Sequence, residues 1–542
     1  MTEYFGFDCG CRFRVLEKKN EDFPRIDFSP KIETINLECS RTWELISSGN
    51  TKGCFQLESR LGQSMAKKLK PENIEQLSAL ISIMRPGCLE AFRDGKSVSN
   101  HFMDKKNGLE SVDYFHPALE SSLKSSYGEM IYQEQAMEIA KNVAGFDLKE
   151  ADMLRKAIGK KKPEEMAKVK KKFLDGSKSL NIVSESQAEE IFSWIEKSQR
   201  YSFNKSHAVS YAINAYLSAY TKAHFPKVFF ASYLKFAKDK IDPQQEIKEL
   251  VRNANEMSVD VHIPDIRLLN EYFTIHDKKI FFGLTDIKGV GASVYKKIKE
   301  LSQDKDMYKM SWIEVLLKIL LRINSTATKS LISCGALDFV KMNRTEMLFE
   351  YEICSSLTTK ELENFQNLVN QGTFKSIKDV LVHMVSTKLA TKKRLEVLIN
   401  LIKSIDHPPY SLIDKIEWLS DSENSLLGAA ITCSKLDSYD ISMANTDCKT
   451  FKNSGLSSNI IIAGEICNIN VVKTKTGKTP GLDMAFISIE DQTGMLDSII
   501  MFPEQWAKYK THMFIGNILI FTGNKAKNKD GLIVEKCFNP VS

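Results

Sequence analysis

Apolar residues recur three and four positions apart through most of residues 41–240, which is the spacing of the buried face of an α-helix. The stretches "GEMIYQEQAMEIAKNVAG" (128–145) and "SESQAEEIFSWIEKS" (184–198) show this period clearly. The pattern predicts one large helical domain over residues 41–240. Residues 1–40 lack it, and Pro24 and Pro30 would interrupt a helix, so we expect an irregular N-terminal arm there.

The period changes after residue 240. "EYFTIHDKKIFFGL" (271–284) alternates apolar and polar residues, which predicts a hairpin that turns at Asp277-Lys278. "DIKGVGASVYKKI" (286–298) reads as the hairpin and second helix of a helix-hairpin-helix unit, to which we assign residues 241–345. Gly289 and Gly291 would let backbone N–H groups approach a phosphate at a helix N-terminus, and a plain helix cap is the alternative.

Residues 346–456 again have helical spacing but carry no chemistry that the sequence reveals, so we predict a helical linker region. From residue 457 to 542 short alternating segments are separated by turns that contain Gly, Asn and Lys, which predicts a small five-stranded barrel of the OB type. We therefore expect a mainly α, multidomain chain that ends in a β-barrel. Barrels of this kind bind single strands through such turns, so Lys473, Lys475 and Lys478 are candidate DNA-binding residues; a solvated turn is the alternative.

Length and composition indicate a multidomain globular protein. The chain has 542 residues, of which 43% are hydrophobic and 27% charged, and no apolar run reaches the length of a membrane span. The polar start lacks the order of a signal peptide, so we expect a cytoplasmic protein with no membrane partner.

The eleven cysteines include no C-x-x-C pair, so neither a disulfide framework nor a zinc ribbon is indicated. Cys9-Gly-Cys11, with Cys39 or Cys54, could supply metal ligands. The C-x-C spacing is unusual for structural zinc, so we predict a plain turn and no metal site.

Positive charge gathers in residues 141–172, which hold eleven Lys and Arg against five Asp and Glu. This local excess of six equals the net charge of +6 of the whole chain, which points to a polyanionic partner. A solvated helix face is the alternative.

A polar cluster interrupts the apolar pattern in "RYSFNKSHAVSYA" (200–212), where Asn204, Lys205, Ser206 and His207 follow one another. A lysine among packing residues is costly unless an anion meets it, which suggests an anionic ligand. The alternative for His207 is a core histidine bonded to a neighbour.

Five strings in a fixed order together resemble the fingers domain of the alpha subunit of bacterial DNA polymerase III, the family C polymerases. The strings are "GNTKGCFQLES" (49–59), "MRPG" (84–87), "YGEMIYQEQAMEIAKNVAGF" (127–146), "ADMLRKAIGKKKPEEMAK" (151–168) and "FNKSHAVSYA" (203–212). The resemblance continues through the helix-hairpin-helix, which is like the clamp-binding domain of that family, to "SLLGAAITCSKLD" (425–437) and the barrel.

The resemblance implies that residues 41–240 are polymerase fingers that close over a dNTP. The implied triphosphate-binding residues are Arg85, Arg155, Lys156, Lys160, Lys205 and His207. The implied DNA-binding residues are Lys161 and Lys162, in addition to the two glycines and three lysines above. For Gln133, Glu134 and Gln135 a structural role and DNA contact are equally expected.

The chain departs from the family because its first family string begins near residue 31, which leaves no room for the PHP domain, the palm or the thumb. Asp8 and Asp27 are isolated carboxylates rather than the paired aspartates that two-metal chemistry needs. We therefore expect a split polymerase, inactive alone, with palm aspartates and Mg²⁺ on a separate PHP/palm/thumb chain. The rival expectation is a non-catalytic DNA- or clamp-binding regulator derived from a polymerase.

Primer-template DNA and dNTP are the implied partners, in a bacterial or phage-infected bacterial cell. The clamp peptide of the family begins with Gln, and "QNLVN" (366–370) and "QGTF" (371–374) match it poorly, so a sliding clamp stays an open candidate.

Overall fold

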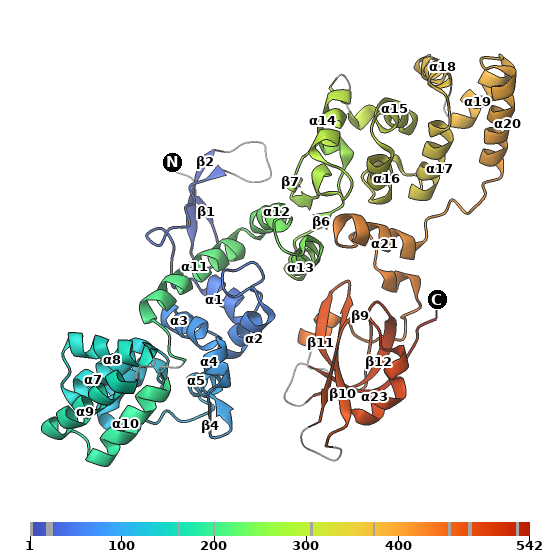
Figure 1. Ribbon diagram of the computed structural model, residues 1–542. Coiled ribbons are helices and arrows are strands. Elements are labelled where there is room, and N and C mark those ends of the chain that lie inside the picture. Colours follow the sequence, from blue (N-terminus) through green and yellow to red (C-terminus); the bar gives the residue numbers. More distant parts are fainter. Residues whose placement is uncertain are drawn as a thin grey trace. The chain divides into compact units, whose positions relative to one another are not determined.

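The computed structural model describes residues 4–17, 25–160, 163–198, 201–303, 307–371, 374, 376–453, 457–474, 480–526 and 531–541. The chain divides into two compact units, Met1–Phe229 and Phe230–Ser542 (Figure 1). Helices predominate in both units and a closed barrel forms the end of the second, so the predicted mainly α fold class is confirmed. Among the described residues, no helix is both long and apolar enough to cross a bilayer.

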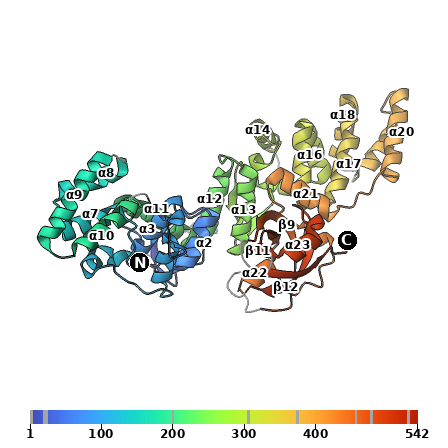
Figure 2. The ribbon, with the colours of Figure 1, turned by 60° about the horizontal axis from the view of Figure 1, so that its bottom comes forward.

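The first unit has two hydrophobic cores. One core is built by α1 (Ser40–Ser47), α2 (Arg60–Leu69), α3 (Ile74–Ile83), α4 (Pro86–Glu90), α5 (Val98–Lys106) and α11 (Lys205–His224). The other is built by α6 (Glu120–Leu123), α7 (Gln133–Ala144), α8 (Leu148–Lys160), α9 (Pro163–Leu180) and α10 (Glu185–Ser198), of which α7–α10 gather in one bundle (Figure 2). Gly176 allows α9 to pack closely against the end of α7, because a Cβ at this position would lie 2.1 Å from the Ala144 carbonyl oxygen.

The N-terminal arm is not irregular, and that prediction was wrong. It forms a three-stranded antiparallel sheet of β1 (Tyr4–Gly6), β2 (Arg12–Glu17) and β3 (Arg25–Ile26). The strands are short, and the buried Phe13 packs against Phe28 and Phe225. Because the contact with Phe225 joins residues far apart in the chain, no local period in the sequence could reveal the sheet.

The second unit begins with the end of α12 (Pro226–Ala237) and with α13 (Pro243–Glu256). A small sheet follows, with β6 (Val261–His262), β7 (Thr274–His276) and β8 (Lys279–Phe281). The predicted hairpin is confirmed, since β7 and β8 are antiparallel and Asp277 and Lys278 turn between them with φ of 46° and 63°. Both central residues thus have positive φ, as the tightest hairpin turns require.

Helices continue the second unit as the sequence predicts. They are α14 (Ala292–Leu301), α15 (Trp312–Lys318), α16 (Ser325–Ser333), α17 (Arg344–Ser355), α18 (Thr359–Asn370), α19 (Ile377–Ser386), α20 (Lys392–Asp406) and α21 (Ile416–Leu427). The buried Arg344 of α17 joins two other segments, because its guanidinium donates to Asp338, in the turn between α16 and α17, and to the buried Glu423 of α21.

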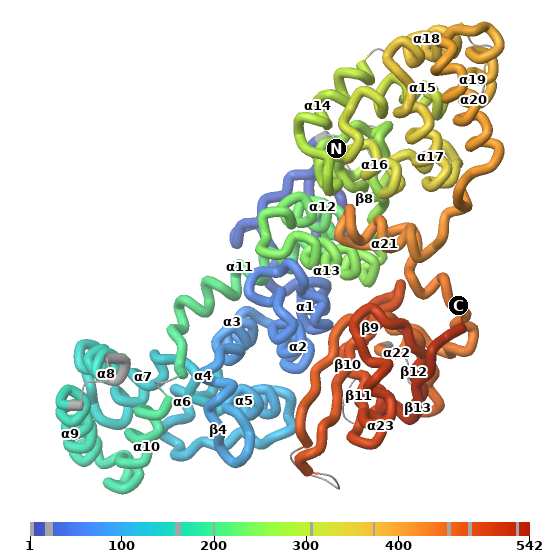
Figure 3. The backbone as a smooth tube through the Cα atoms, turned by 45° about the vertical axis from the view of Figure 1, so that its right-hand side comes forward, coloured from blue at the N-terminus to red at the C-terminus, as the bar shows by residue number. Residues whose placement is uncertain are grey.

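The chain ends in a closed barrel of β9 (Ile460–Lys473), β10 (Asp483–Asp491), β11 (Gly494–Met501), β12 (Ile518–Lys525) and β13 (Leu532–Phe538) (Figure 3). Around the barrel the order is β9-β10-β11-β13-β12, and β11 pairs with β13 in parallel. The short helix α23 (Pro503–Tyr509) lies in the chain between β11 and β12. This is the OB-type barrel that the alternating pattern predicts.

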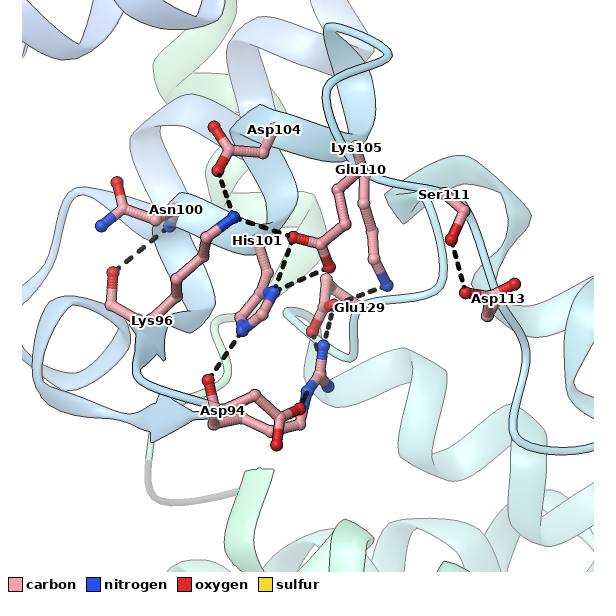
Figure 4. Close-up of polar contacts among 12 residues, drawn as sticks. Asp94, Lys96, Asn100, His101, Asp104, Lys105, Glu110, Ser111, Asp113 and Glu129 are labelled. Carbon is pink, nitrogen blue, oxygen red and sulfur yellow. Dashed lines mark hydrogen bonds and ion pairs between the residues drawn. The ribbon is translucent and has the colours of Figure 1, made fainter.

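A buried polar network fixes the segment around α5 in the first unit (Figure 4). Glu129, which is 1% exposed, accepts hydrogen bonds from Arg93 at 2.6 Å and from the buried Lys105 at 2.9 Å. His101 lies between two acceptors, Glu110 at 2.8 Å and the Arg93 carbonyl at 2.8 Å. Burial raises the pKa of Glu110, but the hydrogen bond from His101 and the nearby positive charges outweigh it, and this pKa lies below its usual value.

We predict that Glu129→Gln loosens this part of the first unit. The substitution keeps the shape of the side chain but leaves the buried Lys105 without its counter-charge, and breaking a buried ion pair costs about 3–5 kcal/mol. Hydrogen exchange of α5, followed by mass spectrometry, should accelerate by about 100-fold or more. Glu138→Gln, at an exposed position on α7, is the matched control and should leave α5 unchanged. If α5 exchanges its hydrogens equally slowly in the Glu129→Gln and Glu138→Gln variants, Glu129 does not hold this segment.

Candidate nucleotide and nucleic-acid interfaces

The N-terminus of α11 is fixed by a carboxylate from another helix. Glu134, in the first turn of α7, accepts hydrogen bonds from the Asn204 side chain at 2.8 Å and from the Lys205 backbone N–H at 2.9 Å. Asn204 caps α11 by accepting from the His207 backbone N–H at 2.9 Å. Phe203 also exchanges backbone hydrogen bonds with Ile131 and Gln133. The start of α11 is thus locked onto the start of α7.

Gln135 has the structural role that the sequence left open. Its side-chain oxygen accepts from the backbone N–H groups of Ile131 and Tyr132, both at 2.9 Å, and its nitrogen donates to Ser122 and Ser126. Glu134 is structural as well, since it holds the start of α11.

Four rings form a column along the first half of α11, and we call this column the aromatic face. His207 and Tyr211 belong to the helix, Phe203 precedes it, and Phe55 comes from a separate loop. Ring centroids lie 5.4 Å apart for Phe203–His207, 4.2 Å for His207–Tyr211 and 5.1 Å for Phe55–Tyr211. All four residues are exposed or half-buried. His207 is exposed, so the alternative of a core histidine is wrong.

Two of the predicted cations lie near the aromatic face: Arg85 stacks on one of its rings, and Lys205 is in the first turn of α11. The Arg85 guanidinium lies 4.0 Å from the centroid of Phe203, and within the described chain Arg85 has no ion pair. The ammonium of Lys205 lies 5.5 Å from the Tyr132 ring and 3.4 Å from a Glu75 oxygen. Lys205 is half-buried rather than enclosed, so its charge is met by solvent and Glu75 without a ligand. Both cations can therefore receive an anion that approaches the aromatic face.

Phe55 belongs to this face, although the sequence did not single it out. Its loop is held by α11: the buried Lys222 ammonium donates to the carbonyls of Asn50 and Lys52, both at 2.8 Å, and Ser218 accepts from the Phe55 N–H at 3.0 Å. The signal available in advance was its place within the string "GNTKGCFQLES".

The predicted cations on α8 belong to a helix whose apolar side packs into the other core of the first unit. Arg155 and Lys156 both contact Asp152 on their own helix, at 2.8 Å and 2.7 Å. These hydrogen bonds, that of Lys156 first, lower the pKa of Asp152. The side chain of Lys160, and Lys161 and Lys162 as a whole, lie outside the described residues. That the α8 cations reach the same ligand as Arg85 and Lys205 stays a prediction.

The two glycines of the helix-hairpin-helix have different surroundings. Gly289 has a φ of +94°, and a Cβ there would lie 2.8 Å from the Ser330 hydroxyl, so this glycine is needed for packing. Gly291 is the N-cap residue of α14, is exposed, and has no atom within 4 Å of the place where a Cβ would stand. The free N-terminus of α14 therefore faces solvent at Gly291, which is the arrangement that phosphate binding needs.

On the barrel, Lys473 is exposed at the end of β9, where the first long turn begins. Lys475 and Lys478 lie outside the described residues, so their part in DNA binding stays a prediction.

The chain thus combines a helical unit that carries exposed cations and rings with a helix-hairpin-helix region and an OB-type barrel, which is an architecture typical of nucleic-acid-binding proteins. Comparison with known families narrows this class. Residues 15–181 match the bacterial DNA polymerase III alpha subunit finger domain, and residues 258–347 match a helix-hairpin-helix motif.

Individual relatives match over nearly the whole chain. The DNA polymerase III subunit alpha of Aquifex aeolicus is 30% identical over 90% of this chain and 37% of its own length. The subunit from Borreliella burgdorferi is 29% identical over 97% of this chain and 42% of its own length. The subunit from Pseudomonas aeruginosa is 29% identical over 95% of this chain and 42% of its own length. The chain spans about two fifths of the length of these relatives. The findings identify it as a homologue of the C-terminal half of bacterial DNA polymerase III alpha subunits.

We predict that Gly291→Asp weakens the binding of duplex DNA while the fold is kept. The substitution meets no steric obstacle, but it places a negative charge where a phosphate would bind. Affinity measured by fluorescence anisotropy at low salt should fall about tenfold. The slope of log K against log salt concentration should also become shallower, by the amount expected for the loss of about one phosphate contact.

The matched control is Gln303→Glu, which adds the same charge just beyond the opposite end of α14 at an exposed position. An equal loss of affinity in both variants would mean that net charge, not a phosphate at Gly291, explains the effect.

Proposed function

We propose that this chain carries the fingers and DNA-binding surfaces of a family C replicative DNA polymerase, and that it binds dNTP and primer-template while a separate chain supplies the palm aspartates. The observation that carries the proposal is the aromatic face, with Arg85 stacked on Phe203 and Lys205 in the first turn of α11. Arg85 lies within the finger-domain match and Lys205 within the longer match to the alpha subunits.

Arg85 is suited to hold phosphate oxygens. Because the guanidinium stacks on Phe203 and within the described chain has no acidic partner, its planar set of N–H donors remains available to a bidentate oxyanion. The stacking also restricts the side chain before the ligand arrives. Arg85 thus offers a preorganised donor for the triphosphate of an incoming nucleotide.

Lys205 acts beside it as a second positive charge. Its backbone is fixed by Glu134, so the side chain starts from a rigid point, while Glu75 forms an exposed ion pair that a phosphate can replace at little cost. Positive groups placed before the reaction stabilise charge that grows on the transferred phosphoryl group. The base of the nucleotide would lie against the exposed rings of His207, Tyr211 or Phe55, because stacking accepts any base.

The metal ions belong, in this proposal, to the partner chain. Mg²⁺ bound by paired aspartates would activate the primer 3′-hydroxyl and neutralise the leaving pyrophosphate. On this chain the two carboxylates beside Lys205 already have partners: Glu134 holds the start of α11 and Glu75 pairs with Lys205. That pairing supports a metal site outside this surface.

The helix-hairpin-helix and the barrel would bind the template and primer. Gly291 at the N-terminus of α14 suits a duplex phosphate, and Lys473 at the barrel turn suits a single strand. A sliding clamp is a further proposed partner.

We predict that mixing this chain with a palm-bearing chain from the same genome, primer-template, dNTPs and Mg²⁺ gives primer extension that neither chain gives alone. Lys205→Ala should lower the extension rate about 100-fold, in the range lost when a charge-stabilising donor is removed. Arg85→Lys should raise the KM for dNTP about tenfold, because lysine keeps the charge but loses the stacked, bidentate geometry.

Lys31→Ala, at another exposed position of the first unit, is the control and should leave both the extension rate and the KM for dNTP unchanged. If the chain binds DNA but never stimulates extension, and nucleotide does not alter that binding, the polymerase proposal fails and a non-catalytic regulator takes its place.

A further inference from the structure

Three cysteines and one histidine from distant parts of the first unit meet at one point. Cys9 and Cys11 lie in the turn between β1 and β2, Cys39 precedes α1, and His224 is the last residue of α11. One ligand atom from each residue lies within 4.8 Å of all the others. Cys9 and His224 are 215 positions apart in sequence, and Cys39 and His224 are 185 apart.

The spacing of these atoms fits a tetrahedral zinc ion. With Zn–S near 2.3 Å and Zn–N near 2.0 Å, two ligands of a tetrahedral site lie about 3.5 Å apart for sulfur and nitrogen and about 3.8 Å for two sulfurs. The Nε2 atom of His224 lies 3.4 Å from the Cys9 sulfur and 3.7 Å from the Cys39 sulfur. These separations leave room for an ion between the ligands, and none of the three cysteines forms a disulfide bond.

The histidine is already oriented for coordination. Its other ring nitrogen, Nδ1, lies 2.9 Å from the Tyr220 carbonyl, to which it must donate because a carbonyl only accepts. In the neutral ring this leaves a lone pair on Nε2, directed at the sulfurs. A backbone carbonyl in this position is the usual outer partner of a metal-bound histidine. The Tyr220 ring stacks on His224 at 4.1 Å and Phe7 meets its edge at 4.7 Å.

The surroundings also suit a structural ion. Cys11, Cys39 and His224 are buried and Cys9 is half-buried, so the point of convergence is closed off from bulk water. Gly10, with a φ of +83°, makes the turn that brings Cys9 and Cys11 to the same side. Cys39 occupies the N-cap position of α1 and makes no side-chain capping hydrogen bond there. The three cysteines and the histidine thus converge on one largely buried point.

We propose that Cys9, Cys11, Cys39 and His224 bind one structural zinc ion, which fastens the β1–β2 hairpin to the start of α1 and to the end of α11. The expectation of a plain turn at Cys9-Gly-Cys11 is correct for the backbone, but the prediction of no metal ligand is replaced by this proposal. Cys54, the other partner considered from the sequence, is not among the four residues that converge. A closed four-ligand site leaves no open position for catalysis, so its role would be to hold the fold.

The test is the metal content of the full chain, purified under reducing conditions without added chelator. Mass spectrometry of the metals should find close to one zinc ion per chain. After removal of zinc, Co²⁺ should restore the visible absorption of a tetrahedral site with thiolate ligands. Zinc-free protein should also show faster hydrogen exchange in β1 and β2, while the barrel in the second unit is unchanged.

The variant arm compares Cys39→Ser with Cys54→Ser, since both cysteines are buried in the same core. Cys39→Ser should lower zinc affinity at least tenfold, and Cys54→Ser should keep it. A chain that carries no zinc and gives no Co²⁺ absorption would overturn the proposal, and so would a disulfide found among these cysteines. Because the wild-type Co²⁺ spectrum needs no substitution, misfolding of a variant cannot obscure the result.

Discussion

The fixed position of α11 is the constraint on which the first unit depends. Its first turn is held by Glu134. Near its end, its own buried Lys222 donates hydrogen bonds to the carbonyls of Asn50 and Lys52. A fully buried ammonium group is tolerated only when hydrogen-bond acceptors of the protein replace its water. The loop before Phe55, which supplies these carbonyls, is therefore fixed in position against α11. His224, the last residue, packs against the N-terminal sheet through Phe7 and Phe13.

This constraint explains how the exposed aromatic face can be rigid. Phe203, His207 and Tyr211 stand on or beside one helix whose opposite side is buried through residues such as Ala212 and Tyr216. The rings are held in place by the helix, and Arg85 is already stacked on Phe203. A surface that is arranged beforehand loses less conformational entropy on binding, which favours both affinity and catalysis.

Much of the fold could be predicted because its signals are local. Helical period, the Asp277-Lys278 turn and the alternation after residue 457 each depend on neighbours in sequence, and the structure contains all three features. The contacts that sequence reasoning missed are long-range. The sheet of the arm depends on Phe225, and the meeting of Cys9 with His224 crosses 215 positions, which no spacing rule for metal ligands could recognise. Family strings marked the neighbourhood of Arg85 and Lys205, but the hydrogen bonds by which Glu134 holds the start of α11 join residues about 70 positions apart and were not predicted.

The central claim is that the surface beside α11 receives the phosphates of a nucleotide, and the chemical reactivity of Lys205 tests it most directly. Amine acylation of the active two-chain complex, mapped by mass spectrometry, should show Lys205 protected several-fold when primer-template and matched dNTP are bound. Lys178, exposed on α9, reports the general reactivity of surface lysines. Unchanged labelling of Lys205 in a complex that binds nucleotide and extends primers would contradict the account.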